Sequence, residues 1–254
     1  MRKACLFMIS ARNHLLKECL TYVDSNYNKK YNYPILIFYH NHLSDTYGNE
    51  YYREDIRRIN SKTDIRFHPI EAKIPDHLQE KDMFWNLPNA YAANFGRQRL
   101  GYLHANHFWN NFMNYSELDE FDYMMRIDDD SWFKKEIPFD FFEELDNRNG
   151  YFGTGFTWNH FSSGHMDTRY GLFEWIKNYV EKYNITVKDE QLRESLNGEI
   201  NNIKFHTLKW NCGNSNVYNR KMFETEEWKR YLNEFNSSGG GYRYRWVDCE
   251  ILGL

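Results

Sequence analysis

Short apolar runs alternate with amphipathic stretches along the first part of the chain. Residues 3–10 and 33–40 are nearly continuous apolar runs, which are typical of buried strands, and residues 65–70 are expected to form a third, short strand. Between them, residues 15–27 carry their apolar side chains on one helical face, and residues 50–59 are also expected to be helical. This strand–helix–strand order predicts an α/β fold with a mostly parallel sheet.

The rest of the chain continues with elements of both kinds. We expect further strands at residues 121–127 and 150–158, and a loop that enters a strand at 211–218. We expect further helices at residues 97–113, 138–145, 171–183, 188–200 and 225–235. Because no repeat and no long flexible linker interrupts this pattern, we predict one domain over residues 1–254 with a mixed, mostly parallel central sheet.

The composition of the 254 residues argues against several classes of protein. Hydrophobic residues make up 41% of the chain, enough for a core, and a net charge of −4 does not suggest a nucleic-acid-binding protein. The four cysteines form no CxxC pair, so no zinc site is expected. No stretch approaches the roughly 20 apolar residues of a transmembrane helix, and the apolar start is too short for a signal peptide. We therefore expect a soluble protein, whose compartment and oligomeric state stay open.

Three consecutive aspartates follow the predicted strand 121–127 and are the strongest chemical signal. In an extended chain, side chains two residues apart lie on the same side, so Asp128 and Asp130 are expected to reach one divalent cation. Oxygen-only ligands suit Mn²⁺ or Mg²⁺, and open α/β sheets bind their ligands at the carboxyl ends of strands. Arg126 adds a fixed cation near the same place. The alternative is a solvated acidic turn that caps the next element.

Arg12 and Asn13, at the end of the first predicted strand, are a second candidate for ligand binding. Taken alone, the pair is better explained as a helix cap by Asn13, with Arg12 on the surface.

A third candidate lies near the end of the sequence. Asp248 and Glu250 follow Arg245 and Trp246, and an acid in such a setting can bind an acceptor hydroxyl or act as a general acid or base. The three glycines at 239–241 are expected to form a flexible loop through which a substrate approaches. The alternative is an ordinary chain end.

In their order along the chain, these segments resemble glycosyltransferase family 15, the fungal Golgi α-1,2-mannosyltransferases that use GDP-mannose and Mn²⁺. The residues that carry the resemblance are 11–13, 27–34, 102–108, 122–129, 150–153, Asn214, 239–240 and 245–248. The last of these segments reads Arg-Trp-Val-Asp, where the family has Arg-Trp-Gly-Asp. The resemblance implies a GT-A (Rossmann-like) fold with a nucleotide-sugar-binding half at about residues 1–135 and an acceptor-binding half at about residues 136–254.

The resemblance also implies roles for individual residues. Asp128 takes the place of the metal-binding glutamate of the family, and Asp130 is the candidate for a second metal ligand. Asp248 would hold sugar hydroxyls, and together with Glu250 and Asn216 it is a candidate catalytic residue. The residues expected to contact the nucleotide-sugar donor are Arg12, Asn13, Tyr102, His107, Arg126, Asp129, Asn214, Arg245 and Trp246.

Three departures from the family pattern bear on the mechanism. Asn216 stands where the family has its candidate catalytic glutamate, and an amide cannot serve as a carboxylate nucleophile. His107 replaces an arginine of the family. The family also continues past residue 254 with a segment in which we expect a metal-binding histidine. Either the chain is a shortened relative, or Asp130 completes the metal shell.

These observations predict a metal-dependent glycosyltransferase that moves a hexose, with mannose from GDP-mannose favoured, to a glycan or glycoprotein acceptor. One alternative is a catalytically degenerate protein that binds a sugar nucleotide or a glycan without turnover, which Asn216 would favour. Another is a different metal-dependent nucleotidyl or phosphoryl transferase. The absence of a GxxxxGK[ST] loop argues against a P-loop enzyme.

Overall fold

The computed structural model describes residues 2–83, 100–154, 158–159, 171–188, 190–197, 209–210, 215–244 and 246. The strands in these ranges are β1 Ala4–Ile9, β2 Ile35–His40, β3 Ile65–Ile70, β4 Tyr123–Ile127, β5 Phe152–Thr154, β6 Trp158–Asn159, β7 Lys209–Trp210 and β8 Ser215–Asn219. The α-helices are α1 Asn13–Val23, α2 Lys29–Tyr31, α3 Ser44–Tyr47, α4 Glu50–Arg57, α5 Leu100–Asn111, α6 Phe141–Asn147, α7 Leu172–Lys182, α8 Glu190–Asn197, α9 Glu226–Ser238 and α10 Gly240–Arg243. In the described ranges, no helix is both long and apolar enough to cross a membrane.

A six-stranded sheet in the order β3-β2-β1-β4-β8-β5 forms the centre of the fold. The pairs β3–β2, β2–β1 and β1–β4 are parallel, whereas β8 runs antiparallel to both β4 and β5. The predicted α/β fold with a mixed, mostly parallel sheet is therefore confirmed. Strands β6 and β7 form a separate antiparallel pair.

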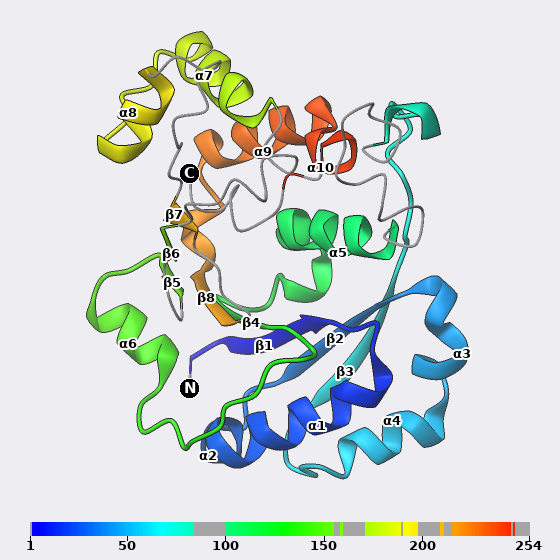
Figure 1. Ribbon diagram of the computed structural model, residues 1–254. Coiled ribbons are helices and arrows are strands. Elements are labelled where there is room, and N and C mark those ends of the chain that lie inside the picture. Colours follow the sequence, from blue (N-terminus) through cyan, green and yellow to red (C-terminus); the bar gives the residue numbers. More distant parts are fainter. Residues whose placement is uncertain are drawn as a thin grey trace. The chain divides into compact units, whose positions relative to one another are not determined.

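Helices α1, α4 and α6 cover one face of the six-stranded sheet (Figure 1). Along β1, Ala4, Leu6 and Met8 point to this face, because side chains alternate along a strand. They pack with Leu16 and Leu20 of α1 in one buried cluster. The period of about 3.6 in α1 is thus explained by this core, whereas the continuous apolar run of β1 reflects burial of the strand on both faces.

The opposite face of the sheet carries an aromatic cluster. The rings of Phe7 on β1 and Phe112, which follows α5, lie 4.9 Å apart between centroids. Phe112 also lies 5.0 Å from Tyr218 of β8. All three side chains are almost fully buried, so part of the high aromatic content serves the core.

Contacts between residues divide the chain into two compact units. The first consists of Met1–Ala72, Phe112–Gly155 and Gly213–Lys229, and includes the six-stranded sheet. The second consists of Lys73–Asn111, Phe156–Cys212 and Arg230–Leu254. The chain passes repeatedly between them. The proposed division by ligand, at about residue 135, concerns binding and stays a prediction.

Near the end of the second unit, the three glycines do not form the expected flexible loop. Gly239 has φ +68°, a conformation that favours glycine, and it ends helix α9. The next residue, Gly240, begins the short helix α10 and lies against the ring of Trp246. A Cβ atom at Gly240 would lie only 1.9 Å from the Trp246 ring, so this glycine is needed for close packing.

Candidate functional site

The carboxyl ends of β1 and β4 lie side by side at the middle of the six-stranded sheet. Strand β1 is flanked by β2 on one side and by β4 on the other, with Phe7 paired to Arg126. The strands β2 and β3 are thus added on one side of β1, whereas β4 is added on its other side. Such a switch point is where open α/β sheets bind ligands, because the loops that follow the two strands diverge there.

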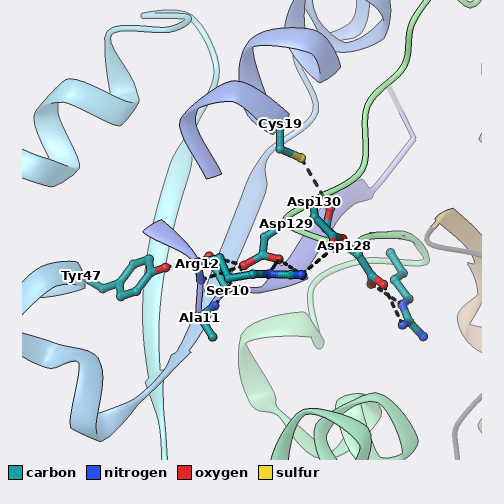
Figure 2. Close-up of polar contacts among 9 residues, drawn as sticks. Ser10, Ala11, Arg12, Cys19, Tyr47, Asp128, Asp129 and Asp130 are labelled. Atoms are coloured by element: carbon teal, nitrogen blue, oxygen red, sulfur yellow. Dashed lines mark hydrogen bonds and ion pairs between the residues drawn. The ribbon is translucent and has the colours of Figure 1, made fainter. Parts of the chain in front are cut away.

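The three aspartates after β4 form a turn. The backbone N–H of Ser131 donates to the carbonyl oxygen of Asp128 at 3.0 Å, so the chain is not extended here, as the pairing of Asp128 with Asp130 had assumed. Figure 2 shows the carboxylates of Asp128 and Asp129 pointing in different directions. Side chains therefore do not alternate through residues 128–130 as expected, although both candidate metal ligands do follow the buried strand.

Asp129 holds together the turn between β1 and α1. Its carboxylate is 2% exposed and accepts hydrogen bonds from Ser10 Oγ at 2.9 Å and from the backbone N–H groups of Ala11 and Arg12, both at 3.1 Å. Arg12 Nε donates to the other oxygen at 2.9 Å. Both carboxylate oxygens are thus engaged by the protein, and this placement favours a supporting role for Asp129 over direct contact with a donor.

Arg12 lies between two carboxylates, as Figure 2 shows. Its Nε and Nη2 atoms bond to Asp129, and its Nη1 atom lies 2.5 Å from Asp130 Oδ2. Burial tends to lower the pKa of Arg12, but the bonds to Asp129 and the charges of both aspartates outweigh it and raise the pKa above its usual value. Asn13 is exposed as the first residue of α1, and the residue at the capping position is Arg12, which makes no side-chain capping bond, so the expected cap by Asn13 was wrong.

Arg126 is buried on β4 and forms a second arginine–aspartate pair. Its Nε lies 2.9 Å from Asp128 Oδ1, and its Nη2 lies 3.3 Å from Asp128 Oδ2. This two-point contact fixes the planar guanidinium group. Each candidate metal ligand, Asp128 and Asp130, is therefore accompanied by its own arginine.

Asn216 lies on β8 directly opposite Arg126 in the antiparallel ladder. Opposed residues of such a ladder present their side chains on the same face. Asn216 is 1% exposed, and its Nδ2 donates to Tyr218 Oη at 3.3 Å. Its Oδ1 atom accepts no hydrogen bond within the described part of the chain. A buried carbonyl oxygen without a donor is costly, and a bound polar group would supply one.

Three further candidates belong to the second unit. Tyr102 is exposed on α5, and burial lowers the pKa of His107 on the same helix. His107 lines a small hollow together with Asn110 and Tyr242. Trp246 is buried and packs in a cluster with side chains of α7 and α9, including Trp175, a placement that favours packing over stacking on a ligand. The remaining candidates, Asn214, Arg245, Asp248 and Glu250, lie outside the described residues.

Two residues that support the site were not anticipated. Ser10 is fully buried and links Asp129 to Tyr47, whose hydroxyl lies 2.8 Å from Ser10 Oγ. Burial raises the pKa of Tyr47 to about 12, so its hydroxyl stays protonated and can donate to Ser10. A polar residue that ends a buried apolar run was the available signal for Ser10. Nothing local to Tyr47 distinguished it from the many other tyrosines.

The side chains at this edge fit a hard divalent cation in their chemistry, since carboxylate oxygens are the preferred ligands of Mn²⁺ and Mg²⁺. In the described ranges, no group of three or more His, Cys, Asp or Glu side chains is arranged to hold a metal ion. Two carboxylates leave most of an octahedral shell to other oxygens, such as those of a diphosphate and water.

This topology, with an acidic turn at the switch point of a mostly parallel sheet, is that of the GT-A glycosyltransferase fold. The chain belongs to the family described as Glycolipid 2-alpha-mannosyltransferase, which matches residues 1–254. The resemblance proposed from the sequence is therefore confirmed. No curated protein sequence matches the chain.

Solved structures agree with this family. Core-mannan synthase A from Aspergillus fumigatus, in a form with Mn and GDP, superposes with a TM-score of 0.78 at 18% identity, over 100% of this chain and 70% of that one. The mannosyltransferase Ktr4p from S. cerevisiae, in complex with GDP, gives 0.78 at 17% identity, over 100% of this chain and 66% of the yeast protein. At such identities the match establishes the fold, and the chain spans only about two thirds of these relatives.

Proposed function

We propose that this chain is a metal-dependent glycosyltransferase that moves mannose from GDP-mannose to a glycan or glycoprotein acceptor. The observation that carries the proposal is the acidic turn 128–130 at the switch point of a GT-A sheet, with an arginine beside each of its two outer carboxylates. The two relatives that bind GDP, one of them together with Mn, support the choice of donor and metal.

In this proposal, Asp128 and Asp130 bind Mn²⁺ or Mg²⁺ together with the donor diphosphate. The cation would stabilise the negative charge that develops on the leaving diphosphate. Arg12 and Arg126 lie beside these carboxylates and would contact the phosphates or the ribose. Asn216, with a carbonyl oxygen that lacks a donor, would accept a hydrogen bond from a sugar hydroxyl and position the hexose.

The remaining roles rest on the family resemblance. Tyr102, His107, Asn214 and Arg245 are proposed to contact the donor. Asp248, or Glu250, is proposed to orient or deprotonate the acceptor hydroxyl. Because Asn216 is an amide, we do not assign it the part of a covalent nucleophile.

Transfer of mannose from GDP-mannose to a mannoside acceptor tests the proposal. We expect turnover that requires Mn²⁺, is abolished in the variant with Asp128→Asn and Asp130→Asn, and is retained in Asp55→Asn. Asp55 is a surface carboxylate on α4 that pairs with Lys17, so its replacement controls for loss of charge. Full activity of the double variant in the presence of a chelator would overturn the proposed mechanism.

A second candidate function is binding of a sugar nucleotide without turnover. The buried amide of Asn216, where the family has a candidate catalytic glutamate, favours it. A single experiment distinguishes the two candidate functions. Mn²⁺-dependent binding of GDP-mannose, without release of GDP over many hours in the presence of acceptors, would support the binding protein.

A further inference from the structure

The two carboxylate partners of Arg12 differ in exposure. Asp129 is 2% exposed, whereas Asp130 is 33% exposed and Arg12 itself 46%. We infer that the contact between Arg12 and Asp130 is exchangeable, and that its exchange couples cation binding to nucleotide binding. This inference rests on the proposed function, because it takes Asp130 as a metal ligand.

The Asp129 end of the arrangement is fixed. Asp129 accepts hydrogen bonds from Ser10 Oγ and from two backbone N–H groups of the turn after β1, in addition to its bonds with Arg12. Withdrawal of Arg12 would leave this buried carboxylate without its counter-ion, which is unfavourable. The Nε edge of the guanidinium group is therefore held in place whether or not a ligand is bound.

The contact between Arg12 and Asp130, in contrast, can be exchanged for another partner. The contact between Arg12 Nη1 and Asp130 Oδ2, at 2.5 Å, lies where water can replace either partner. Ion pairs of this exposure are weak. A divalent cation that binds Asp130 would remove this acceptor from Arg12 and repel the guanidinium charge.

Once Asp130 has bound a cation, Nη1 of Arg12 needs another acceptor. Since Asp129 still holds Nε and Nη2, the guanidinium group stays at the carboxyl end of β1 and presents Nη1 to an anionic oxygen of the nucleotide. Binding of the cation thus prepares Arg12 for the nucleotide. By linkage, the nucleotide must raise the affinity for the cation by the same factor.

The inference is tested by measuring the affinity of the full chain for Mn²⁺, with and without GDP, in the wild-type protein and in Arg12→Gln. Since Arg12 competes with the cation for Asp130, Arg12→Gln should bind Mn²⁺ alone about two- to fivefold more tightly. It should also show a smaller increase in Mn²⁺ affinity on addition of GDP than the wild type does. Lys17→Gln is the matched control, because it removes one positive charge from an exposed surface pair on α1. It should leave both quantities nearly unchanged.

Arg12→Lys keeps the charge but lacks the fork that spans two carboxylates, and it should also bind Mn²⁺ alone more tightly. Circular dichroism would show that each variant is folded. If neither Arg12 variant binds Mn²⁺ alone more tightly than Lys17→Gln does, the inference is overturned while the proposed function stands. If the wild-type chain binds no Mn²⁺ even with GDP present, both are overturned.

Discussion

Asp129 accepts hydrogen bonds from Ser10 and from the backbone of the turn before α1, whereas its neighbours Asp128 and Asp130 each pair with a different arginine. The sequence places these three carboxylates together but does not distinguish them. Their burial distinguishes them. The buried carboxylate of Asp129 needs hydrogen-bond donors from the protein, whereas the carboxylates of Asp128 and Asp130 are partly accessible to a ligand. The middle aspartate is therefore a support for the site.

At this scale, substitutions of the two neighbouring residues Asp129 and Asp130 should differ in their effect on stability. Asp129→Ala should lower the free energy of unfolding by about 3 kcal/mol, because it leaves the Ser10 hydroxyl, two backbone N–H groups and the Nε and Nη2 atoms of Arg12 without their acceptor. Asp130→Ala should cost less than about 1 kcal/mol, since it removes only an exposed pair. Urea denaturation measures both values, and equal losses would contradict the assigned roles.

His107 gives a prediction about pH. Burial lowers its pKa below the ordinary value of 6.5, because the charged ring loses its water. Between the lowered pKa and 6.5, the unfolded chain binds a proton that the folded chain does not, so stability falls as the pH decreases through this range. His107→Gln should therefore flatten the dependence of the melting temperature on pH below 6.5. His14→Gln, which removes an exposed histidine of α1, is the control, and parallel curves for His107→Gln and wild type would refute the prediction.

At the scale of elements, Gly239 and Gly240 join two helices where a flexible loop was expected. Glycine suits a loop because it tolerates many backbone conformations, but it also permits close approach of another group. Local sequence does not separate these two uses, since the group that approaches, the indole of Trp246, is known only from the fold. The same contact contributes to the burial of Trp246, together with the side chains of α7 and α9.

Substitution of neighbouring glycines tests this explanation. Gly240→Ala would place a Cβ atom 1.9 Å from the Trp246 ring, and we expect it to lower the free energy of unfolding by about 1–3 kcal/mol. Gly241→Ala is the matched control, because its Cβ atom would meet nothing closer than 3.8 Å. Thermal unfolding of the two variants is the measurement. A Gly240 variant as stable as the Gly241 variant would show that the glycine is not required for packing.

At the scale of the whole molecule, the sequence predicted the sheet better than it predicted the site. The apolar runs that became β1, β2 and β4 were recognisable because strands buried on both faces show little alternation. The placement of β4 beside β1 and the meeting of Arg12 with Asp129 were not predictable, because they join positions more than a hundred residues apart. The apolar pattern predicted an α/β fold, and the family resemblance identified it as a GT-A fold. The order of the family motifs along the chain was sufficient for this, although the identity to a solved relative is only 18%.

We propose that the chain binds a guanosine diphosphate sugar through a divalent cation. The most direct test is the melting temperature of the full chain with GDP, GDP-mannose, UDP and UDP-glucose, each with and without Mn²⁺. A ligand that binds only the folded state at one hundred times its dissociation constant stabilises it by about 2.7 kcal/mol. We predict a rise with GDP and GDP-mannose that requires Mn²⁺ and is lost in the Asp128→Asn, Asp130→Asn variant. A rise with uridine compounds alone, or no rise with any nucleotide, would contradict the account.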